Sequence, residues 1–323
     1  METTLEYQDF LLSCDWGTSS FRLSVIDCST SQLSRKITTG GGVKTLFTEW
    51  SGSDTPVSRQ AFFLDYLLNR IHELEELLDF DATGIPVVIS GMASSSIGIT
   101  ELPYADIPFS LDEPILPTKL ILATEQFPHD ILLVSGIKTV DDVMRGEEVQ
   151  LLGLNPDRFS DRLMCVIPGT HSKHVHIEDR MIRDFDTFMT GEVFDLLGTW
   201  SVLSDSVKSP DTPIHTDAFR EGVELAQHEA FLHALFHIRT NELLLKIDKT
   251  YNYDILSGLV IGTEIASLQE IGEADICLVS GGPLSKRYEI AMRSLGLHPT
   301  LITRTDELVM KGHIKIVNHR NLM

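Results

Sequence analysis

Residues 10–27 read FLLSCDWGTSSFRLSVID, in which two apolar runs flank a short polar turn. The first run, Phe10–Cys14, is apolar almost throughout, whereas Phe21–Asp27 alternates apolar and polar residues as a half-buried strand does. This pattern predicts a β-hairpin whose turn contains Asp15 and Gly17. Because glycine has no Cβ, the backbone of such a turn can approach a phosphate closely, and its N–H groups and hydroxyls can donate to phosphate oxygens.

The same pattern returns in the second half of the chain. Leu163–Ile167 is an apolar run, Pro168–Lys173 is a polar turn with a Gly-Thr pair, and His174–Ile177 predicts a returning strand. A duplicated α/β chain would contain two such hairpins, and the two turns predict a phosphate tail held between two domains. The predicted phosphate-binding residues are Gly17, Thr18, Ser19, Gly169, Thr170, Ser172 and Lys173.

A third segment also points to a nucleotide. Gly281 and Gly282 join a predicted strand to a predicted helix, and they would let an adenine or its ribose approach the backbone. Taken singly, each hairpin could be an ordinary turn, and the two glycines an ordinary strand–helix connection. The three segments in this order favour nucleotide binding. The chain contains neither GxxxxGK[ST] nor GxGxxG, which argues against P-loop and Rossmann folds.

The charge of the chain disfavours several classes of partner. The 26 Lys and Arg residues and 47 Asp and Glu residues give a formal net charge of −21, which argues against binding to nucleic acid or to anionic membranes. No apolar run approaches the roughly 18 residues that span a bilayer, and the first ten residues lack signal-peptide features. The four cysteines show no CxxC spacing. We therefore expect a cytoplasmic protein with reduced thiols.

A domain boundary is predicted near Asn155-Pro156. Residues 1–155 would form an N-terminal lobe with the first turn and the substrate site, and residues 304–323 could join that lobe. Residues 156–303 would form a C-terminal lobe with the second turn and the adenosine site.

Apolar spacing predicts five helices, over residues 58–78, 142–153, 217–245, from 257 onward and 285–295. Ser58 and Thr216 are the predicted N-cap residues of the first and third. Extended chain is predicted over 102–127 and a flexible loop at 40–42.

The order of these motifs resembles that of the actin-like ATPase superfamily, which includes the sugar kinases and hexokinase. More narrowly, the chain is similar to the 2-dehydro-3-deoxygalactonokinase family. The segments that carry this resemblance are residues 15–22, 90–93 (SGMA), 143–150 (VMRGEEVQ), 168–173 (PGTHSK), 188–192 (FMTGE) and 257–264 (SGLVIGTE). It implies an α/β, ribonuclease H-like fold with duplicated mixed-sheet domains in two lobes. It also implies phosphorylation of 2-dehydro-3-deoxy-D-galactonate at its 6-hydroxyl, with ATP and Mg²⁺.

The resemblance assigns roles to acidic residues. In related sugar kinases, an acid where a strand meets a helix takes the proton from the attacking hydroxyl. Asp142 fits that position first and Glu147 second, and the alternative is an acidic helix start that the helix dipole favours. Asp15, at the end of its strand, could hold Mg²⁺, often through water.

A sugar acid also requires a cation in the site. Arg145 is the preferred partner for a substrate carboxylate, because a guanidinium can bind it through two hydrogen bonds, and Lys138 is the second candidate. The alternative for Arg145 is a structural ion pair with Glu148 or a contact with Asp142.

Two further residues are predicted to lie near the sugar. Ser94 belongs to segment 93–98, which differs from the family pattern and is expected to face the substrate. Glu192 follows Thr190-Gly191 and would help to close the site, although this segment could equally begin a helix. A second departure is His174, where the family pattern has Trp.

Several alternatives stay open from the sequence. The chain could phosphorylate another sugar or sugar acid, or it could bind ATP as a metabolite sensor without transferring phosphate. Only His233 and His237 among the closely spaced histidines have helical ligand spacing, so no zinc site is expected. The expected partners are ATP and a small sugar acid, with a homo-oligomer left open.

Overall fold

The computed structural model describes residues 9–30, 32–53, 57–211 and 213–322. The chain divides into two compact units. The first comprises residues up to Pro156, together with Arg180–Arg183 and the segment from Thr305 onward. The second comprises Asp157–Asp179 and Asp184–Arg304.

A six-stranded sheet organises the first unit, in the order β3-β2-β1-β4-β8-β7. β1 pairs antiparallel with β2, as the hairpin pattern predicted, and β2 pairs antiparallel with β3. β4 and β8 run parallel to β1, which places the ends of these three strands at one edge of the sheet. The strand bounds are β1 Phe10–Trp16, β2 Phe21–Asp27, β3 Gln32–Thr39, β4 Val87–Gly91, β7 Thr118–Ile121 and β8 Ile131–Val134.

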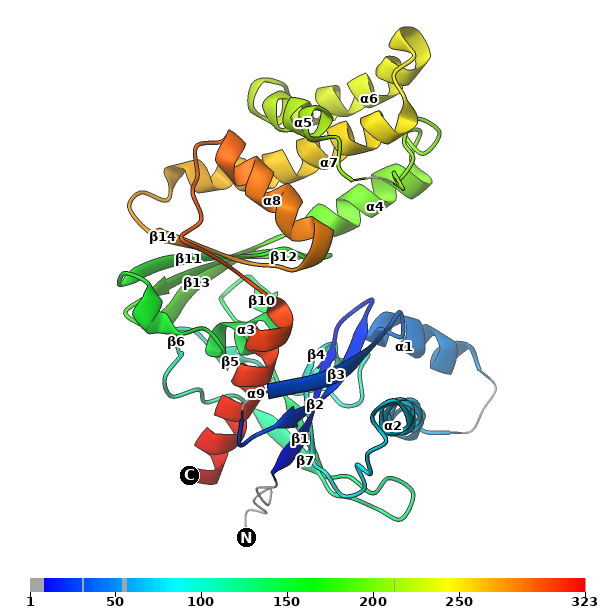
Figure 1. Cartoon of the computed structure of the whole chain (residues 1–323), viewed down its shortest axis with the longest axis vertical. Helices are drawn as coiled ribbons and strands as arrows, with labels where there is room; N and C mark the ends of the chain where they lie inside the picture. Colours follow the sequence, from blue (N-terminus) through cyan, green and yellow to red (C-terminus); the bar gives the residue numbers. More distant parts are fainter. Residues whose placement is uncertain (1–8, 31, 54–56, 212, 323) are drawn as a thin grey trace. The chain divides into compact units, whose positions relative to one another are not determined.

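Helices lie on both faces of this sheet (Figure 1). Alternate residues of β1, from Leu12 to Trp16, join the apolar core beneath α2, whereas Ser13 on the other face contacts α9. Ser58 caps α2 as predicted, because its hydroxyl accepts a hydrogen bond from the N–H of Ala61. The helices are α1 Val43–Gly52, α2 Arg59–Leu78, α3 Glu147–Leu152 and α9 Thr305–Leu322.

Short strands occupy the proline-rich segment, as expected for residues 102–127. β5 (Ala105–Asp106) joins β9 (Ile137–Lys138) and β10 (Val143–Met144) in a small three-stranded sheet of order β10-β9-β5. β6 (Phe109–Ser110) pairs with Met181 and Ile182, which belong to the first unit.

The second unit repeats the strand order of the first. Its strands run β15-β14-β11-β12-β13, with β11 antiparallel to β12 and parallel to β14. The first unit has the same arrangement in β8-β4-β1-β2-β3. This duplication of a mixed sheet confirms the predicted actin-like, ribonuclease H-like fold class. The strand bounds are β11 Arg162–Ile167, β12 Ser172–Glu178, β13 Met181–Phe188, β14 Asp275–Val279 and β15 Leu301–Thr303.

The helices α5 to α8 gather on one side of this sheet (Figure 1). Three predictions were wrong here. The N-cap residue of α5 is His215, and Thr216, predicted as the cap, is the first residue of the helix. The helix expected over 217–245 is broken at Glu229–Ala230, where the backbone is extended, and Ser257-Gly258 lies inside α7 instead of opening a helix. The helix bounds are α4 Thr190–Trp200, α5 Thr216–His228, α6 Phe231–Leu245, α7 Lys249–Ala266 and α8 Gly282–Ser294. No helix among the described residues is long and apolar enough to cross a membrane.

Two glycines explain how closely α5 and α7 pack. A Cβ on Gly222 of α5 would lie 2.0 Å from the carbonyl oxygen of Ile255 in α7. A Cβ on Gly258 of α7 would lie 2.0 Å from the carbonyl oxygen of Phe219 in α5. The two helix backbones therefore touch directly. This reciprocal contact is the structural role of Gly258, which the sequence pattern had suggested as a helix start.

Candidate active site

The first turn places an acid at the end of β1. Asp15 pairs with Arg22 in the register of the β1–β2 hairpin, and Arg22 Nη1 lies 2.7 Å from Asp15 Oδ2. The Asp15 side chain is 13% exposed, so its carboxylate is mostly desolvated but still reachable. Arg22 is a partner that sequence reasoning missed, although the register of a short hairpin would have placed it opposite Asp15.

The first turn is held by the start of α1. The Gly17 N–H donates to the carbonyl oxygen of Ser20, and the carbonyl oxygens of Gly17 and Thr18 accept from Val43 and Lys44. A Cβ on Gly42 would lie 2.3 Å from the Thr18 carbonyl oxygen, so the chain approaches the turn as closely as glycine allows. Residues 40–42 form a loop, as predicted, and close packing on the turn requires glycine at position 42.

The start of α3 meets the ends of β1 and β4. Gly146, the N-cap residue of α3, has φ of 112°, a backbone conformation that favours glycine. A Cβ there would lie 3.2 Å from Gly91 Cα at the end of β4 and 4.0 Å from Asp15 Oδ1. Asp15, Gly91 and Gly146 thus form one corner of the first unit, which we call the β1–β4–α3 corner.

The predicted helix start at Asp142 was wrong. Val143 and Met144 form β10 instead, paired with β9, and the positive φ of Gly146 delays the helix until Glu147. Asp142 lies in the turn before β10, where its N–H donates to Thr139 Oγ1 at 2.8 Å. The acid at the start of the helix is therefore Glu147.

Two neighbouring glutamates at this helix start have different environments. Glu147 is half-buried, and its Oε2 accepts a hydrogen bond from the Arg145 N–H at 3.1 Å. Glu148 is fully buried, and both of its oxygens accept from the Gly146 N–H, at 2.9 and 2.8 Å. Burial and, second, the charge of Glu147 hold the pKa of Glu148 well above its ordinary value. Only Glu147 of the two has solvent access.

Arg145 is a buried cation, and its side chain reaches the segment that follows β4. Its Nη1 donates to the carbonyl oxygen of Ser94 and to Ser94 Oγ, both at 2.6 Å, and to Ser135 Oγ at 3.2 Å. Its Nη2 donates to the Leu102 carbonyl oxygen at 3.2 Å, and the guanidinium lies over the ring of Tyr104. Each of these partners is neutral.

No ion pair between the side chains of Arg145 and Glu148 is observed within 4.0 Å among the described residues, but the charge of Arg145 acts on Glu148 and partly offsets the rise in its pKa. The buried Nε of Arg145 and the buried hydroxyl of Ser95 have no hydrogen-bond partner there. The structure thus brings Arg145 and Ser94 together as a buried group with unused donor capacity. Lys138 lies apart from this group of contacts, on β9, and it pairs with Asp106 at 3.4 Å in an exposed ion pair.

A buried histidine supports the ends of β1 and β4 from behind. His313 of α9 bonds Ser13 Oγ through Nδ1 at 2.7 Å and Ser90 Oγ through Nε2 at 3.0 Å. Burial lowers the pKa of His313 to about 3, so its imidazole is neutral at physiological pH. Ser90 directly precedes Gly91 of the corner, which makes His313 a support for its geometry. His313 is 300 positions from Ser13 and 223 positions from Ser90, so no local sequence pattern could have predicted these contacts.

The second turn is built in the same way from residues of the second unit. The Gly169 N–H lies 3.4 Å from Ser172 Oγ, and the Thr170 carbonyl oxygen accepts from the Glu192 N–H at the start of α4. Glu192 Oε2 also lies 2.6 Å from His171 Nε2. Glu192, predicted near the sugar, is therefore bound to the second turn, and its segment begins a helix.

A buried polar network lies beneath the second turn. Ser172 Oγ is 2.8 Å from the Tyr288 hydroxyl of α8, which donates to Glu264 Oε2 of α7 at 2.6 Å. The other oxygen of Glu264 lies 2.9 Å from His174 Nε2. Lys173, on the next position of β12, donates to Thr187 Oγ1 at 2.6 Å. Ser172 and Lys173, both predicted to bind phosphate, thus have hydrogen-bond partners within the second unit.

Gly281 and Gly282 lie at the start of α8 on an exposed surface. Gly281 is the N-cap residue, and Gly282 has φ of 64°. A Cβ at either position would meet no atom within 4 Å, so the backbone here is open to a flat ligand.

Comparison with known proteins agrees with the motifs. The family model described as 2-keto-3-deoxy-galactonokinase matches residues 15–316. A probable 2-dehydro-3-deoxygalactonokinase from Rhizobium meliloti (strain 1021) is 33% identical over 316 residues, covering 94% of this chain and 95% of the relative. The chain belongs to the 2-keto-3-deoxy-galactonokinase family. The resemblance inferred from the sequence is confirmed.

Other members of the 2-keto-3-deoxy-galactonokinase family are also similar to this chain in sequence and in structure. The 2-dehydro-3-deoxygalactonokinase of Escherichia coli (strain K12) is 32% identical over 255 residues, covering 76% of this chain and 82% of its own. A crystal structure from Sinorhizobium meliloti, provisionally assigned the same activity, superposes with a TM-score of 0.79 at 28% identity and covers 95% of each chain. The family match begins at Asp15 and extends into α9, so it includes the β1–β4–α3 corner and its support by His313.

Proposed function

We propose that this chain is an ATP-dependent kinase that phosphorylates 2-dehydro-3-deoxy-D-galactonate at its 6-hydroxyl. The observation that carries this proposal is the β1–β4–α3 corner, where Asp15 and the helix start at Glu147 lie against the same glycine backbone. Membership of the galactonokinase family supports the reaction class and the choice of a sugar acid. The same geometry would serve a kinase for a related sugar acid, which the experiment below distinguishes.

Phosphate-binding residues are assigned in each turn separately. In the first turn, the Gly17 N–H is committed to Ser20, so Thr18 and Ser19 are the phosphate donors there. In the second turn, the Gly169 N–H is likewise directed at Ser172 Oγ, so Thr170 is assigned as the donor and Gly169 lets a phosphate approach the backbone. The open backbone at Gly281–Gly282 receives the adenosine.

Asp15 fits the requirements of a magnesium ligand. Mg²⁺ is usually held by one or two carboxylates together with water and substrate phosphates. Arg22 occupies Asp15 Oδ2, and Oδ1 faces the corner beside Gly146. No cluster of three or more metal-ligating side chains exists among the described residues. When bound, Mg²⁺ would neutralise charge on the transferred phosphoryl group.

Glu147 is assigned as the general base. It is the half-buried acid at the start of α3, and the Arg145 N–H orients its carboxylate. The 6-hydroxyl oxygen of the substrate forms a bond to the γ-phosphorus, the bond from that phosphorus to the β,γ-bridging oxygen breaks, and Glu147 takes the hydroxyl proton. Asp142, the first choice from sequence, lies on the turn before β10 and is the alternative base.

Arg145 is assigned to the substrate carboxylate. A buried guanidinium whose side-chain hydrogen-bond partners are all neutral carries a positive charge that an anionic ligand can help to balance. Its unpartnered Nε, together with the Ser95 hydroxyl, supplies donors for this purpose. Ser94 then acts through Arg145, because both its oxygens hold the guanidinium in place.

The proposal is tested by ADP release from the purified chain with ATP, Mg²⁺ and a panel of acceptors. The panel holds 2-dehydro-3-deoxy-D-galactonate, its C4 epimer, and neutral hexoses, and phosphorus NMR identifies the phosphorylated carbon. The expected result is turnover with the sugar acid and a product phosphorylated at C6. Faster turnover with neutral hexoses would overturn the assignment of substrate, and ATP binding without acceptor-dependent turnover would overturn the assignment as a kinase.

A further inference from the structure

The outer face of α6 carries an apolar stripe that no other element covers. Leu232, Phe236 and Leu243 lie on one side of the helix, and they are 80%, 57% and 44% exposed. The inner side is packed, since Ala234, Leu235 and Ile238 are buried against the core formed with α7. A helix that is apolar on both sides normally buries both of them.

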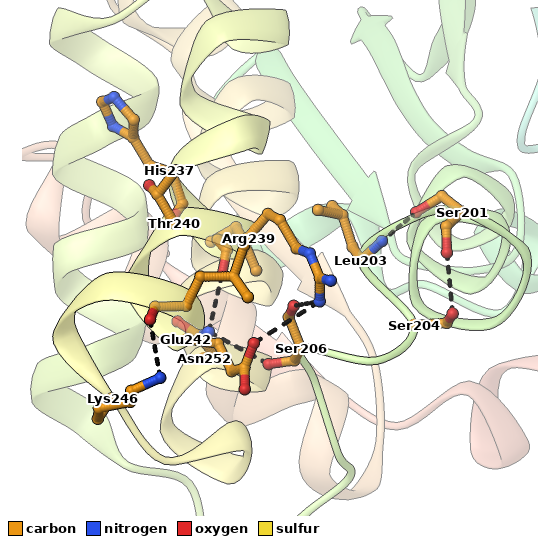
Figure 2. A network of polar contacts seen from close by, with 12 residues as sticks. Ser201, Leu203, Ser204, Ser206, His237, Arg239, Thr240, Glu242, Lys246 and Asn252 are labelled. Carbon is orange, nitrogen blue, oxygen red and sulfur yellow. Dashed lines mark hydrogen bonds and ion pairs between the residues drawn. The ribbon is translucent and has the colours of Figure 1, made fainter.

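The inner side of α6 is held rigidly by polar contacts (Figure 2). Asn252 of α7 donates to the carbonyl oxygens of Ser206 and Ile238, at 3.1 and 2.8 Å. Arg239 reaches from α6 to Ser206 Oγ at 2.9 Å and lies 3.6 Å from Glu242 Oε2. Because these contacts fix the orientation of α6, the stripe is presented in one arrangement, which lowers the entropic cost of binding a partner.

The stripe is self-complementary when two copies are placed antiparallel. About a twofold axis between His237 and Ile238, Leu232 of one copy lies opposite Leu243 of the other. The same operation places Glu229 opposite Lys246 at each end of the contact. Near the axis the same operation places Phe236 opposite Arg239, where a guanidinium can stack on an aromatic ring. Leucines meet farther from the axis and opposite charges meet at the ends, so the contact is isologous.

Charge also favours a second copy over other partners at this face. Residues 229–246 contain two acidic and two basic residues and are formally neutral, whereas the chain carries −21. Self-association elsewhere on so acidic a protein would bring like charges together. At α6 this repulsion is small because segment 229–246 is formally neutral, and the Glu229–Lys246 pairs oppose it.

We infer that α6 is the contact helix of a homodimer, in which the stripe of Leu232, Phe236 and Leu243 packs antiparallel against α6 of a second copy. The interface is small, so we expect reversible association that depends on protein concentration. The inference does not depend on the proposed kinase activity.

The experiment measures the molar mass of the whole chain by light scattering and sedimentation velocity, at about 1 to 100 µM, a range that brackets a weak interface. The expected mass at the upper end is twice 36.1 kDa. Leu232→Asp and Phe236→Asp should each give the monomer mass, and circular dichroism checks that they fold. Leu122→Asp is the matched control, because Leu122 is 55% exposed in the first unit and should leave the dimer intact.

Charge reversal tests the antiparallel arrangement. Glu229→Lys and Lys246→Glu should each weaken the dimer by roughly 10-fold, because each places two like-charged pairs in the interface. The double variant restores opposite charges and should recover most of the wild-type affinity. A monomeric wild-type chain across the whole range would overturn the inference, as would a dimer insensitive to the α6 variants. Failure of the double variant to recover affinity would overturn the antiparallel arrangement.

Discussion

Asp15 and Arg22 face each other across the β1–β2 hairpin, with the guanidinium nitrogen 2.7 Å from the carboxylate oxygen. Arg22 bonds only Oδ2 of Asp15. The other carboxylate oxygen, Oδ1, therefore remains directed toward the β1–β4–α3 corner. A local hairpin thereby aims a carboxylate at the place where phosphoryl transfer is proposed.

Replacing Asp15 removes the charge proposed to hold Mg²⁺. Asp15→Asn should lower kcat by about 100-fold or more, since one preorganised electrostatic contact contributes that much to catalysis. Steady-state kinetics at saturating Mg²⁺ measure the effect. Arg22→Gln is the control, because it breaks the ion pair but keeps the carboxylate, and it should lower kcat much less. Near-normal turnover in Asp15→Asn would assign this acid to the turn alone.

Three acids near α3 can be separated by amide substitutions. Glu147→Gln should lower kcat by about 10² to 10⁴-fold with a small change in KM, as removal of a general base does. Asp142→Asn should retain kcat within a few-fold. Glu148→Gln measures how much the buried carboxyl group next to Glu147 contributes to kcat. If Asp142→Asn shows the large loss and Glu147→Gln does not, the base is Asp142.

Substitution of Arg145 tests the carboxylate site. Arg145→Met should raise the KM for the sugar acid by roughly 10- to 150-fold and leave the KM for ATP nearly unchanged, because a charge-assisted hydrogen bond is lost. Thermal unfolding must be measured in parallel, since Arg145 also holds Ser94 and Ser135. Ser135→Ala perturbs the same packing without removing the charge, and it should leave the KM for the sugar acid close to wild type.

The network beneath the second turn should affect ATP rather than the sugar acid. Tyr288→Phe keeps the buried ring but removes the hydroxyl between Ser172 and Glu264. We expect a stability loss of about 1–3 kcal/mol, because a buried carboxylate loses one hydrogen bond. The KM for ATP should rise while the KM for the sugar acid stays constant. Equal changes in both constants would contradict a role specific to the second turn.

His313 makes stability depend on pH. Its folded-state pKa of about 3 lies below the ordinary value of 6.5, so its contribution is present above pH 6.5 and is lost as the pH falls toward 3. Between pH 7.5 and pH 5 this residue alone should lower the free energy of unfolding by about 2 kcal/mol. Urea denaturation of wild type and His313→Gln measures it, and the variant should lose less stability over that interval. Parallel curves would show that the pKa of His313 is not lowered in the folded protein.

Local patterns predicted the parts of this chain that depend on neighbouring residues. The alternation in Phe21–Asp27 predicted the β1–β2 hairpin, and Ser58 was recognised as a cap because its hydroxyl bonds three residues on. The break between α5 and α6 could not be predicted, because Glu229 and Ala230 carry no glycine or proline signal.

The site was harder to predict than the fold, because its contacts join distant residues. Asp15 was recognised from its own turn, but its proximity to Gly146 depends on packing between β1 and α3. His313 acts on Ser13 across 300 positions, and no local period contains such a contact. Asp142 was predicted as the helix start because acidic residues are typical of the first turn of a helix. The helix begins instead at Glu147, directly after Gly146, which has a positive φ.

The reciprocal contact between Gly222 and Gly258 limits how this protein can change by mutation. At most packed sites, a larger side chain on one helix can be accommodated by a smaller one opposite. Here each glycine already faces a backbone carbonyl, and no amino acid is smaller than glycine. An alanine at either position therefore has no compensating single substitution across the contact, and only separation of α5 from α7 would relieve the clash. Neither glycine can therefore be replaced while the two helices stay in contact. Related chains that keep the close packing of α5 and α7 should keep both glycines.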